Sequence, residues 1–440
     1  MHLLSPRSIA TWLTSIALIY AFSASYAQDA VDRLEPKRIA AIHGAVVELA
    51  SQRKTLAPKR SYDDYRANLH VHSLLSHDSR GKPEEIVAAA KKVNSKVILF
   101  TEHPAPHYDF VNDGHKGLRD GVLLIPGAEA KGLLVYPRES VKEFDSAPTA
   151  EYADIVTRRG GLIFISHLEE RMDLDIPGIT GNEIYNTHAD FKTEKRLMAS
   201  LKNPLWLIQS GDVFKKYPRE AIAALQDYPA DYLKRWDELC KTAPHCGVSA
   251  NDAHQNTGIV LKFAEGNKIR VEDPLGHKLL EIDATLAGAL LPTIKTAKPG
   301  DELYRLQLDY YENSLGLVGT HLLMKELTRE AVWDALQNSR CFVAFDWIAD
   351  STGFDYALFA GETRHEMGSR VLLLSEMTLK AEAPLSVHWR LFRSGELSTE
   401  ANGSTFDAKV TQPGNYRIEA WLDVADERRI WILSNPIYVK

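Results

Sequence analysis

Residues that could bind metal ions recur where short apolar segments of this chain end. They are His70, His72, Glu102, His103, Glu129, His167, Glu183, His188, Asp252 and His254. Imidazole nitrogens and carboxylate oxygens are ligands of zinc, manganese and iron, and a carboxylate can bridge two ions. One histidine after a strand is ordinary, but a series of such strand ends in sequence order is hard to obtain by chance. The pattern therefore predicts a multinuclear metal site.

Alternating strands and helices would have to position these residues. Apolar segments that predict strands occupy residues 67–71, 96–101, 122–125, 161–166, 183–186, 205–209 and 246–250. A helix is predicted over residues 83–93, with proline in its first turn and two glutamates near the positive end of its dipole. Strands separated by helices indicate βαβ units and a mainly parallel sheet, here a closed or nearly closed barrel. The strand ends would then meet at one mouth.

Two pairs of residues within this set are spaced as chelates. His70 and His72 should point to the same face, because successive side chains of a strand alternate between its two sides. Asp252 and His254 form the second pair, and His77 follows the first pair by five residues. These pairs favour a metal site over the alternative that the histidines are unrelated core or surface residues.

The chain changes character near residue 357. Strands predicted at 370–381, 385–392, 405–410, 416–422 and 429–433 are separated by Gly, Asn, Pro and Ser, with no helical pattern between them. This is typical of a small antiparallel β-sandwich, in which Trp389, Trp421 and Trp431 are expected to form core. We therefore expect a leader at 1–27, a helical segment at 28–60, a barrel at 61–355 and a β-sandwich at 356–440.

Composition limits the remaining functions. A chain of 440 residues, 45% hydrophobic and 25% charged, can form a large core and is neither disordered nor a coiled coil. Its net charge of -7 argues against extended binding to nucleic acid. Three cysteines are too few for a disulfide scaffold. Cys240 and Cys246 either close a small disulfide loop or remain thiols, and Cys341 is expected to be buried.

The first 27 residues have the pattern of a secretory signal. His2 and Arg7 precede an apolar run at 9–22, and residues 23–27 are mostly small, as at a cleavage site. The apolar run is shorter than the ~20 residues that a membrane-spanning helix needs. We therefore predict cleavage after Ala27 and a secreted or periplasmic protein without a transmembrane span.

The ordered motifs resemble those of the PHP (polymerase and histidinol phosphatase) superfamily. The resemblance rests on His70-Val71-His72, Glu102-His103, Glu129, His167, His188 and Asp252-Ala253-His254. It implies a distorted (βα)7 barrel that commonly holds three divalent ions, here zinc, manganese or iron. Segments 328–340, 415–419 and 434–438 are similar to an exported branch of the carbaryl-hydrolase-like type, which has a C-terminal β-domain. The resemblance covers about residues 66–440.

Carried onto this sequence, the resemblance implies three metal pockets. The first would consist of His70, His72, Glu129 and Asp252. Glu129 would bridge to the second, which is completed by His167 and His188, with Glu183 or Asn186 as alternatives to His188. The third would consist of His77, His103 and His254. One departure is Glu102, where the family usually has aspartate, and we expect it to orient a neighbouring ligand.

Together these features predict an exported metal-dependent hydrolase that cleaves small phosphoesters through a metal-bound hydroxide. Paired divalent ions lower the pKa of a shared water and neutralise charge that develops on the phosphoryl oxygens. The expected catalytic residues are Asp252, His254 and Glu129. Arg80, Lys131 and Arg171 are the candidate substrate-binding cations, because each follows a ligand by a few residues.

Two other functions remain open from the sequence. The same metals could hydrolyse an amide, ester or carbamate, as the carbaryl-hydrolase-like resemblance implies. A non-catalytic exported protein that stores or senses metal is the third interpretation, although a scaffold does not need a bridging carboxylate. Substrate choice would depend on the loops at 104–121 and 255–300, whose conformation the sequence does not reveal.

Overall fold

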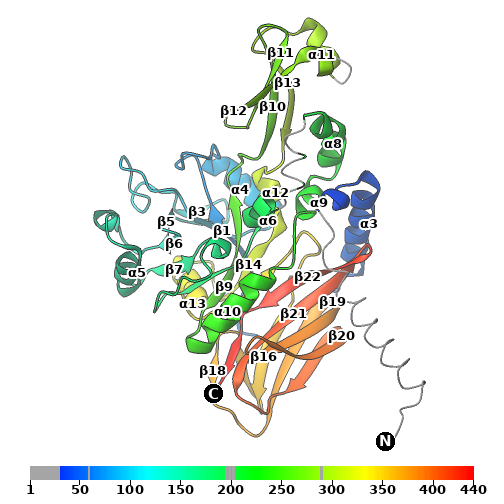
Figure 1. Ribbon diagram of the computed structural model, residues 1–440. Coiled ribbons are helices and arrows are strands. Elements are labelled where there is room, and N and C mark those ends of the chain that lie inside the picture. Colours follow the sequence, from blue (N-terminus) through cyan, green and yellow to red (C-terminus); the bar gives the residue numbers. More distant parts are fainter. Residues whose placement is uncertain (1–29, 58–59, 194–195, 197–199, 201–203, 288–290) are drawn as a thin grey trace, which may run out of the picture.

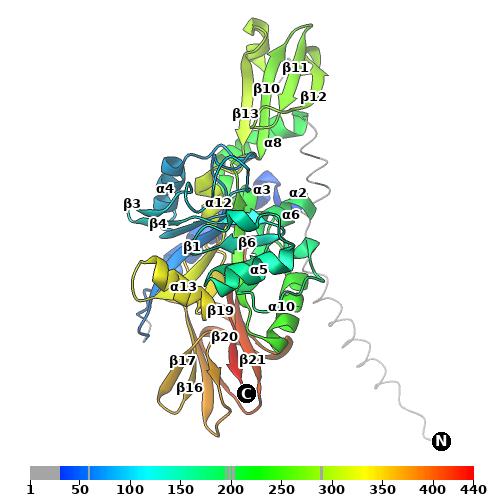
Figure 2. The same ribbon diagram turned by 90° about the vertical axis from the view of Figure 1, so that its left-hand side faces the viewer.

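In the computed structural model, three regions follow one another along the long axis of the molecule (Figure 1). The structure describes residues 30–57, 60–193, 196, 200, 204–287 and 291–440. A mixed α/β region lies in the middle, a small four-stranded sheet projects at one end, and a β-rich C-terminal region forms the other end, as Figure 2 also shows. The predicted leader at 1–27 lies outside the described residues.

Parallel strands of the middle region carry most of the candidate ligands. They are β1 (Asp63–Val71), β2 (Val97–Phe100), β4 (Val122–Ile125), β7 (Leu162–Ile165), β8 (Gly181–Asn186) and β9 (Cys246–Ala253). β1 pairs with β2 on one side and with β9 on the other, β2 continues to β4, and β9 continues through β8 to β7. β2, β4 and β7 are buried throughout, which accounts for their unbroken apolar sequences.

Antiparallel strands complete this sheet between β4 and β7. β5 (Ala128–Ala130) pairs with β6 (Leu133–Tyr136), and β6 pairs with β7. A bridge between Glu102 and Ala128 joins the end of β2 to β5, and the sheet closes into a barrel. β3 (Gly117–Arg119) forms a hairpin with β4. The middle region is therefore an α/β barrel in which β5 and β6 interrupt the alternation of strand and helix.

Helices flank this barrel and the base of the sheet that projects from it. They are α4 (Pro83–Lys92), α5 (Thr149–Arg158), α6 (Thr187–Thr193), α8 (Pro204–Lys216), α9 (Pro218–Ala223), α10 (Ala230–Thr242), α12 (Tyr311–Leu317) and α13 (Arg329–Gln337). The predicted helix at 83–93 is confirmed as α4, which Pro83 opens. The predicted strand at 205–209 is wrong, because these residues lie in α8. A short apolar run does not by itself distinguish a strand from a buried helical segment.

A four-stranded antiparallel sheet follows β9 and projects from the barrel. Its strands are β10 (Gly258–Ala264), β11 (Lys268–Glu272), β12 (Lys278–Asp283) and β13 (Glu302–Gln307), in the order β12-β11-β10-β13. The short helix α11 (Ala284–Ala287) lies between β12 and β13. The sequence led us to expect a loop at 255–300, so this sheet is an addition from the structure.

The C-terminal region is a β-structure in which long strands contact several neighbours. Its strands are β16 (Asp355–Ala360), β17 (Thr363–Glu366), β18 (Arg370–Val371), β19 (Met377–Arg393), β20 (Glu396–Lys409), β21 (Gly414–Val424), β22 (Glu427–Ser434) and β23 (Ile437–Val439). β19 pairs antiparallel with β16, β20 and β21. Trp389, Trp421 and Trp431 are all buried, so their predicted place in the core is confirmed.

The C-terminal region is continuous with the barrel. β14 (Gly319–Met324) pairs with β1, β15 (Cys341–Ala344) pairs with β14, and β22 pairs with β15. The predicted N-terminal helical segment contains α2 (Ala30–Arg33) and α3 (Pro36–Gln52). Arg33 links this segment to the middle region through an ion pair with Asp227 at 2.9 Å, and to the C-terminal region through an ion pair with Glu427 at 3.3 Å. In the described part of the chain, no helix combines the length and apolar content needed to cross a membrane.

All three cysteines are buried free thiols. The sulfur of Cys246 lies 3.4 Å from that of Cys341, whereas Cys240 accepts a hydrogen bond from the Tyr438 hydroxyl at 3.5 Å. Of the two alternatives for Cys240 and Cys246, the structure has thiols, and the predicted burial of Cys341 is confirmed.

Candidate metal centre

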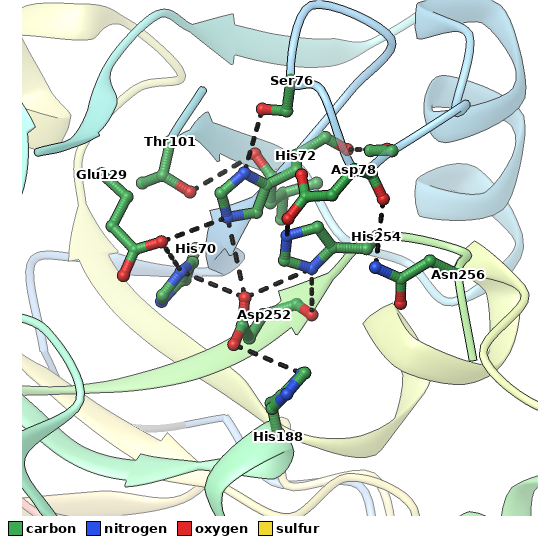
Figure 3. Close-up of polar contacts among 12 residues, drawn as sticks. His70, His72, Ser76, Asp78, Thr101, Glu129, His188, Asp252, His254 and Asn256 are labelled. Carbon is green, nitrogen blue, oxygen red and sulfur yellow. Dashed lines mark hydrogen bonds and ion pairs between the residues drawn. The ribbon is translucent and has the colours of Figure 1, made fainter. Parts of the chain in front are cut away.

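Ligand atoms from the ends of several barrel strands converge in three overlapping groups (Figure 3). The groups are His70, His72 and Asp252; His70, Glu129 and His167; and His72, Asp78, His103 and His254. Within each group, the ligand atoms all lie within 4.8 Å of one another. Residues separated by more than half the barrel sequence therefore meet in a cluster suited to more than one cation.

Irregular backbone directs three of these ligands into the centre. The pairing of β1 with β2 and with β9 shifts register between Leu69 and Val71, and His70 at that point has a φ of 60°. His167 and Asp252 have φ values of 46° and 50°. Residues other than glycine seldom adopt this left-handed conformation, and the strain is tolerated where the surrounding fold enforces it, often at functional sites. His70 therefore reaches the site through a bulge and not through simple strand alternation.

The carboxylates of Glu129 and Asp252 each place both oxygens near histidine nitrogens of the centre. Glu129 places Oε2 3.3 Å from His70 Nε2 and Oε1 3.4 Å from His167 Nε2. Asp252 places Oδ1 3.1 Å from His70 Nε2, and Oδ2 3.4 Å from His167 Nε2 and 3.6 Å from His188 Nδ1. Ligand atoms in a tetrahedral zinc site with bonds of ~2.1 Å lie about 3.4 Å apart. The observed spacing is therefore that of ligands around a shared cation.

Asp78 completes the third group. Its Oδ2 lies 3.3 Å from His103 Nε2 and 3.4 Å from His254 Nε2, and the His254 ring stacks on that of His72 at 3.9 Å. The sequence placed His77 here, but the structure brings in Asp78 instead. The His77 side chain is exposed, with its ring 5.0 Å from that of His103. Both residues occupy one turn, so the turn conformation decides which side chain faces inward.

Four imidazoles are anchored through Nδ1, which leaves Nε2 directed toward the other ligands. The Nδ1 partners are Glu183 Oε1 at 2.6 Å for His70, Ser76 Oγ at 3.1 Å for His72, Glu169 Oε1 at 2.9 Å for His167 and the Asp252 carbonyl oxygen at 3.0 Å for His254. When Nδ1 donates its proton to such an acceptor, the lone pair is on Nε2, as metal coordination requires. The repeated arrangement selects the metal-binding tautomer at each position.

Buried atoms without hydrogen-bond partners test whether these residues fit a metal ion. Among the described residues, His70 Nε2, His72 Nε2, Asp78 Oδ1 and Asp252 Oδ1 are buried and form no hydrogen bond. Each such atom costs about 1–3 kcal/mol when it is left unpaired, and more where the group is charged. Divalent cations would supply the missing partners for all four, so the donor set fits metal ions.

The charges across the centre shift the pKa values of its members. Burial alone would raise the pKa of Asp252, but His70 and His254 hold it well below its usual range. Burial likewise opposes ionisation of Glu129, yet His70 lowers the pKa of that carboxyl to about 2. Burial disfavours the charged form of His70, but Asp252 and Glu129 outweigh it and raise its pKa. Both carboxylates therefore remain ionised and attract cations.

His188 lies at the edge of the centre. Its Nδ1 faces Asp252 across 3.6 Å, and its side chain is 28% exposed. The alternative ligand Glu183 is fully buried and accepts hydrogen bonds from His70 Nδ1, the His167 backbone amide and Asn186 Nδ2. Glu183 and Asn186 thus orient their neighbours, and His188 is left as the candidate ligand on this side.

Glu102 has an orienting position, as the sequence led us to expect. It accepts hydrogen bonds from the Ser73 backbone amide at 3.0 Å and from the Ser76 hydroxyl at 2.7 Å, and Ser76 Oγ contacts His72 Nδ1. Ser76 and Glu169 were not identified from the sequence. Their one sequence signal is proximity, since each follows the histidine that it contacts by a few residues.

The three predicted substrate-binding cations have other contacts. Arg171 donates to the carbonyl oxygens of Ser166 and His167 at 3.1 and 3.3 Å, so it braces the segment that carries a ligand. Arg80 donates to the Leu275 carbonyl oxygen in the projecting sheet, and Lys131 lies over the Tyr152 ring at 5.7 Å. No contact among the described residues joins Arg80 or Lys131 to the metal-ligand groups, so a substrate role for them remains a prediction.

One comparison with known proteins, that with family models, agrees with this geometry. The family model of the PHP domain matches residues 68–234, which include most of the ligands but end before Asp252 and His254. A search of curated proteins found no match. A solved two-domain protein from Bacteroides vulgatus ATCC 8482, described as containing a predicted PHP-like metal-dependent phosphoesterase, is 12% identical with a TM-score of 0.37. That alignment covers 87% of this chain and 98% of the other, a likeness too low to transfer an activity. Residues 68–234 of this protein match the PHP domain family, which is the family that the ligand motifs resemble.

Proposed function

We propose that this protein is an exported metal-dependent phosphoesterase that hydrolyses small phosphoesters at a centre of three divalent ions. The observation that carries the proposal is the set of buried ligand atoms His70 Nε2, His72 Nε2 and Asp252 Oδ1, which form no hydrogen bond and belong to residues of one ligand group. The three groups of ligand atoms overlap at His70 and His72, and each of these imidazoles would bind one ion through Nε2, while the carboxylates of Glu129 and Asp252 could bridge neighbouring ions. Zinc, manganese and iron all suit these donors.

Divalent ions in such a site supply an activated water and neutralise negative charge on a phosphoryl group. The residues of the chain define where a substrate can approach. His70 and His72 are fully buried, whereas the side chains of Asp78, His103 and His188 are 25–29% exposed. The centre is therefore closed at His70 and His72 and reached by solvent at Asp78 and His103 and at His188, where a small phosphoester could enter.

The serine hydroxyls beside the centre hold its carboxylates in place. Ser76 and Ser166 donate their hydroxyl protons to Glu102 and Glu129, at 2.7 and 3.1 Å, and Ser73 donates to Glu102 as well. Water is therefore the nucleophile that we propose. Glu129 and Asp252 would be the carboxylates that bind the metal ions, and His254 lies beside them.

Further parts of the proposal rest on the sequence. Export rests on the signal-like pattern of residues 1–27, and cleavage after Ala27 would release a secreted or periplasmic protein. We retain the distorted (βα)7 description for the barrel at 61–355, and a stabilising or partner-docking role for the β-region at 356–440. The carbaryl-hydrolase-like branch also remains a proposal.

Elemental analysis and a small substrate panel test the activity. Residues 28–440 would be purified, loaded with manganese or zinc, and assayed with p-nitrophenyl phosphate, bis-p-nitrophenyl phosphate and 1-naphthyl carbamate, with and without chelator. We expect chelator-sensitive release of phosphate and three ions per chain. Turnover of the carbamate alone would assign the centre to a different bond, and bound metal without any turnover would contradict an enzymatic role.

A matched pair of variants separates loss of the centre from general damage. Asp252→Asn removes charge from a residue in the centre, whereas Asp423→Asn makes the same change at an exposed position in the C-terminal region. Only the first variant should lose metal and activity. Equal activity in both variants would exclude Asp252 from the catalytic centre.

A further inference from the structure

A cavity adjoins the metal centre on the side of Asp252 and His188. It lies between the barrel mouth and helices α8 and α9, with Leu34 of the N-terminal segment in its wall. Asp252 and His188 belong to both the cavity wall and the metal centre. A substrate whose reacting group lies at the metals can therefore extend into this cavity.

Apolar side chains form most of the cavity wall. They are Leu34, Phe214, Ala221, Ile222, Leu225, Leu308 and Leu317. These residues come from four separate parts of the chain: the N-terminal segment, helices α8 and α9 with the turn that follows, the end of the projecting sheet, and α12. Apolar surface assembled in this way beside a reactive centre is typical of a ligand site.

The polar groups in the wall already have partners within the protein. The Asn251 amide donates to two carbonyl oxygens at 2.8 and 3.0 Å, and the hydroxyls of Thr187 and Ser314 each donate to a carbonyl oxygen at 3.4 and 3.3 Å. Thr257 Oγ1 donates to an asparagine side chain at 3.3 Å, and the Asp309 carboxylate accepts from two backbone amides and a glutamine. What the wall offers a ligand is therefore mainly apolar surface.

The charged residues in the cavity wall indicate which part of a substrate can enter the cavity. Asp252 and Asp309 contribute carboxylates, and the described residues that line the cavity include neither lysine nor arginine. A phosphoryl group would be repelled there and attracted to cations in the metal centre. These carboxylates disfavour an anionic group in the cavity, and its apolar side chains favour an apolar one.

We propose that the substrate is a phosphoester of an apolar alcohol, with an alkyl or aryl group that this cavity holds while the phosphoryl group lies at the metal centre. This inference rests on the proposed phosphoesterase function. In the reaction, a water oxygen forms a bond to phosphorus, the bond from phosphorus to the alcohol oxygen breaks, and a proton from the water goes to the alcohol. The cavity binds the alcohol part on both sides of this step and so selects the substrate.

A series of unbranched alkyl phosphates measures the recognition of the apolar group. Ethyl, butyl and hexyl phosphate have leaving groups of nearly equal basicity, so differences in kcat/KM report binding of the chain. Each methylene buried in the cavity should raise kcat/KM by about fourfold, which corresponds to ~0.8 kcal/mol per buried methylene. Equal kcat/KM for ethyl and hexyl phosphate, with hydrolysis still dependent on metal, would overturn the inference and leave the proposed function intact.

A matched pair of variants tests the position of the alkyl group. Ile222 lines the cavity and is half-buried, so Ile222→Trp should fill part of the space and reduce kcat/KM for hexyl phosphate about tenfold or more, a larger factor than for ethyl phosphate. Ile282 is also half-buried but lies in β12, outside the cavity, so Ile282→Trp is the control. Parallel effects of both variants on both substrates would count against the assigned cavity.

Binding of phosphonates gives a readout that does not depend on turnover. Calorimetric titration of the manganese-loaded protein with ethylphosphonate and hexylphosphonate should give tighter binding of hexylphosphonate, and Ile222→Trp should abolish the difference. If no phosphoester is hydrolysed but hexylphosphonate still binds more tightly, the phosphoesterase function fails while the apolar cavity stands. Equal affinities would reject the cavity as a ligand site.

Discussion

Glu183 Oε1 accepts a hydrogen bond from His70 Nδ1 at 2.6 Å, and both side chains are fully buried. The same glutamate accepts from the His167 backbone amide at 2.8 Å through its other oxygen. One carboxylate thereby fixes the ring of one ligand and the main chain of another. The centre is thus positioned by a shared anchor beneath it as well as by the strand ends themselves.

The first prediction concerns this anchor. Glu183→Gln should lower metal affinity or activity by about 10–100-fold, because the neutral amide no longer holds the Nδ1 proton of His70 with a charged acceptor. Glu265→Gln changes the same side-chain type at an exposed turn of the projecting sheet and should have no effect. Metal titration monitored by calorimetry would measure both. An unchanged affinity in Glu183→Gln would show that the hydrogen bond does not tune the centre.

The second prediction separates Asp78 from its neighbour His77. Asp78→Asn removes the carboxylate charge between His103 and His254 and should lower the metal content by about one ion per chain. His77→Ala removes an exposed ring and should leave the metal content unchanged. Elemental analysis of the two purified variants would distinguish them. Loss of an ion in His77→Ala alone would restore His77 as the ligand.

The third prediction concerns the first group of ligands. His70→Ala and Asp252→Ala should each lower phosphoesterase kcat/KM by at least about a hundredfold, more than a change in an outer residue such as Glu183, while the fold is retained. Circular dichroism would check the fold and a phosphate-release assay the activity. Full activity in either folded variant would refute the assignment of that residue.

The fourth prediction concerns removal of metal. Without cations, the buried ligand atoms of His70, His72 and Asp252 stay unpaired, so the metal-free protein should unfold at a lower temperature. Ligand at a hundredfold excess over Kd stabilises a folded protein by ~2.7 kcal/mol. Thermal unfolding should shift downward with chelator and recover when manganese is added back. The same midpoint in both conditions would argue against a bound ion in the folded protein.

The fifth prediction concerns His321, a buried histidine away from the metal centre. Its Nδ1 lies 2.7 Å from Asp64 and its Nε2 3.0 Å from Asp346. Burial alone would lower the pKa of His321, but the two carboxylates raise it from 6.5 to about 10. Because the folded pKa is the higher one, this stabilisation is complete below the unfolded value of 6.5 and is lost as pH rises through about 10.

The test compares the wild-type protein with His321→Gln. The wild-type unfolding midpoint should exceed that of the variant most at pH 6, and the difference should shrink as the pH approaches 10. Scanning calorimetry at several pH values would measure the two curves. A difference that stays constant across this range would mean that His321 is not held as an imidazolium.

The sequence by itself determined which residue types follow the barrel strands and in what order. His70, His72, His103, Glu129, His167, Asp252 and His254 were identified from these positions, and the structure gathers all of them in one centre. They could be identified because apolar strands are recognisable locally and because parallel strands deliver their ends to one edge. The antiparallel β5 and β6 were not foreseen, since two short strands beside the Glu129 position carry no helical or turn pattern of their own.

Tertiary structure alone decided the rest. The inward direction of Asp78 instead of His77, the bulge at His70, the sheet at 258–307 and the apolar cavity beside Asp252 all depend on contacts between distant segments. Turn and bulge conformations are set by what packs against them, and a cavity wall is shared by parts of the chain that have no common local pattern. Local sequence therefore specifies the ligands, whereas the packed fold specifies their directions and the space that a substrate can occupy.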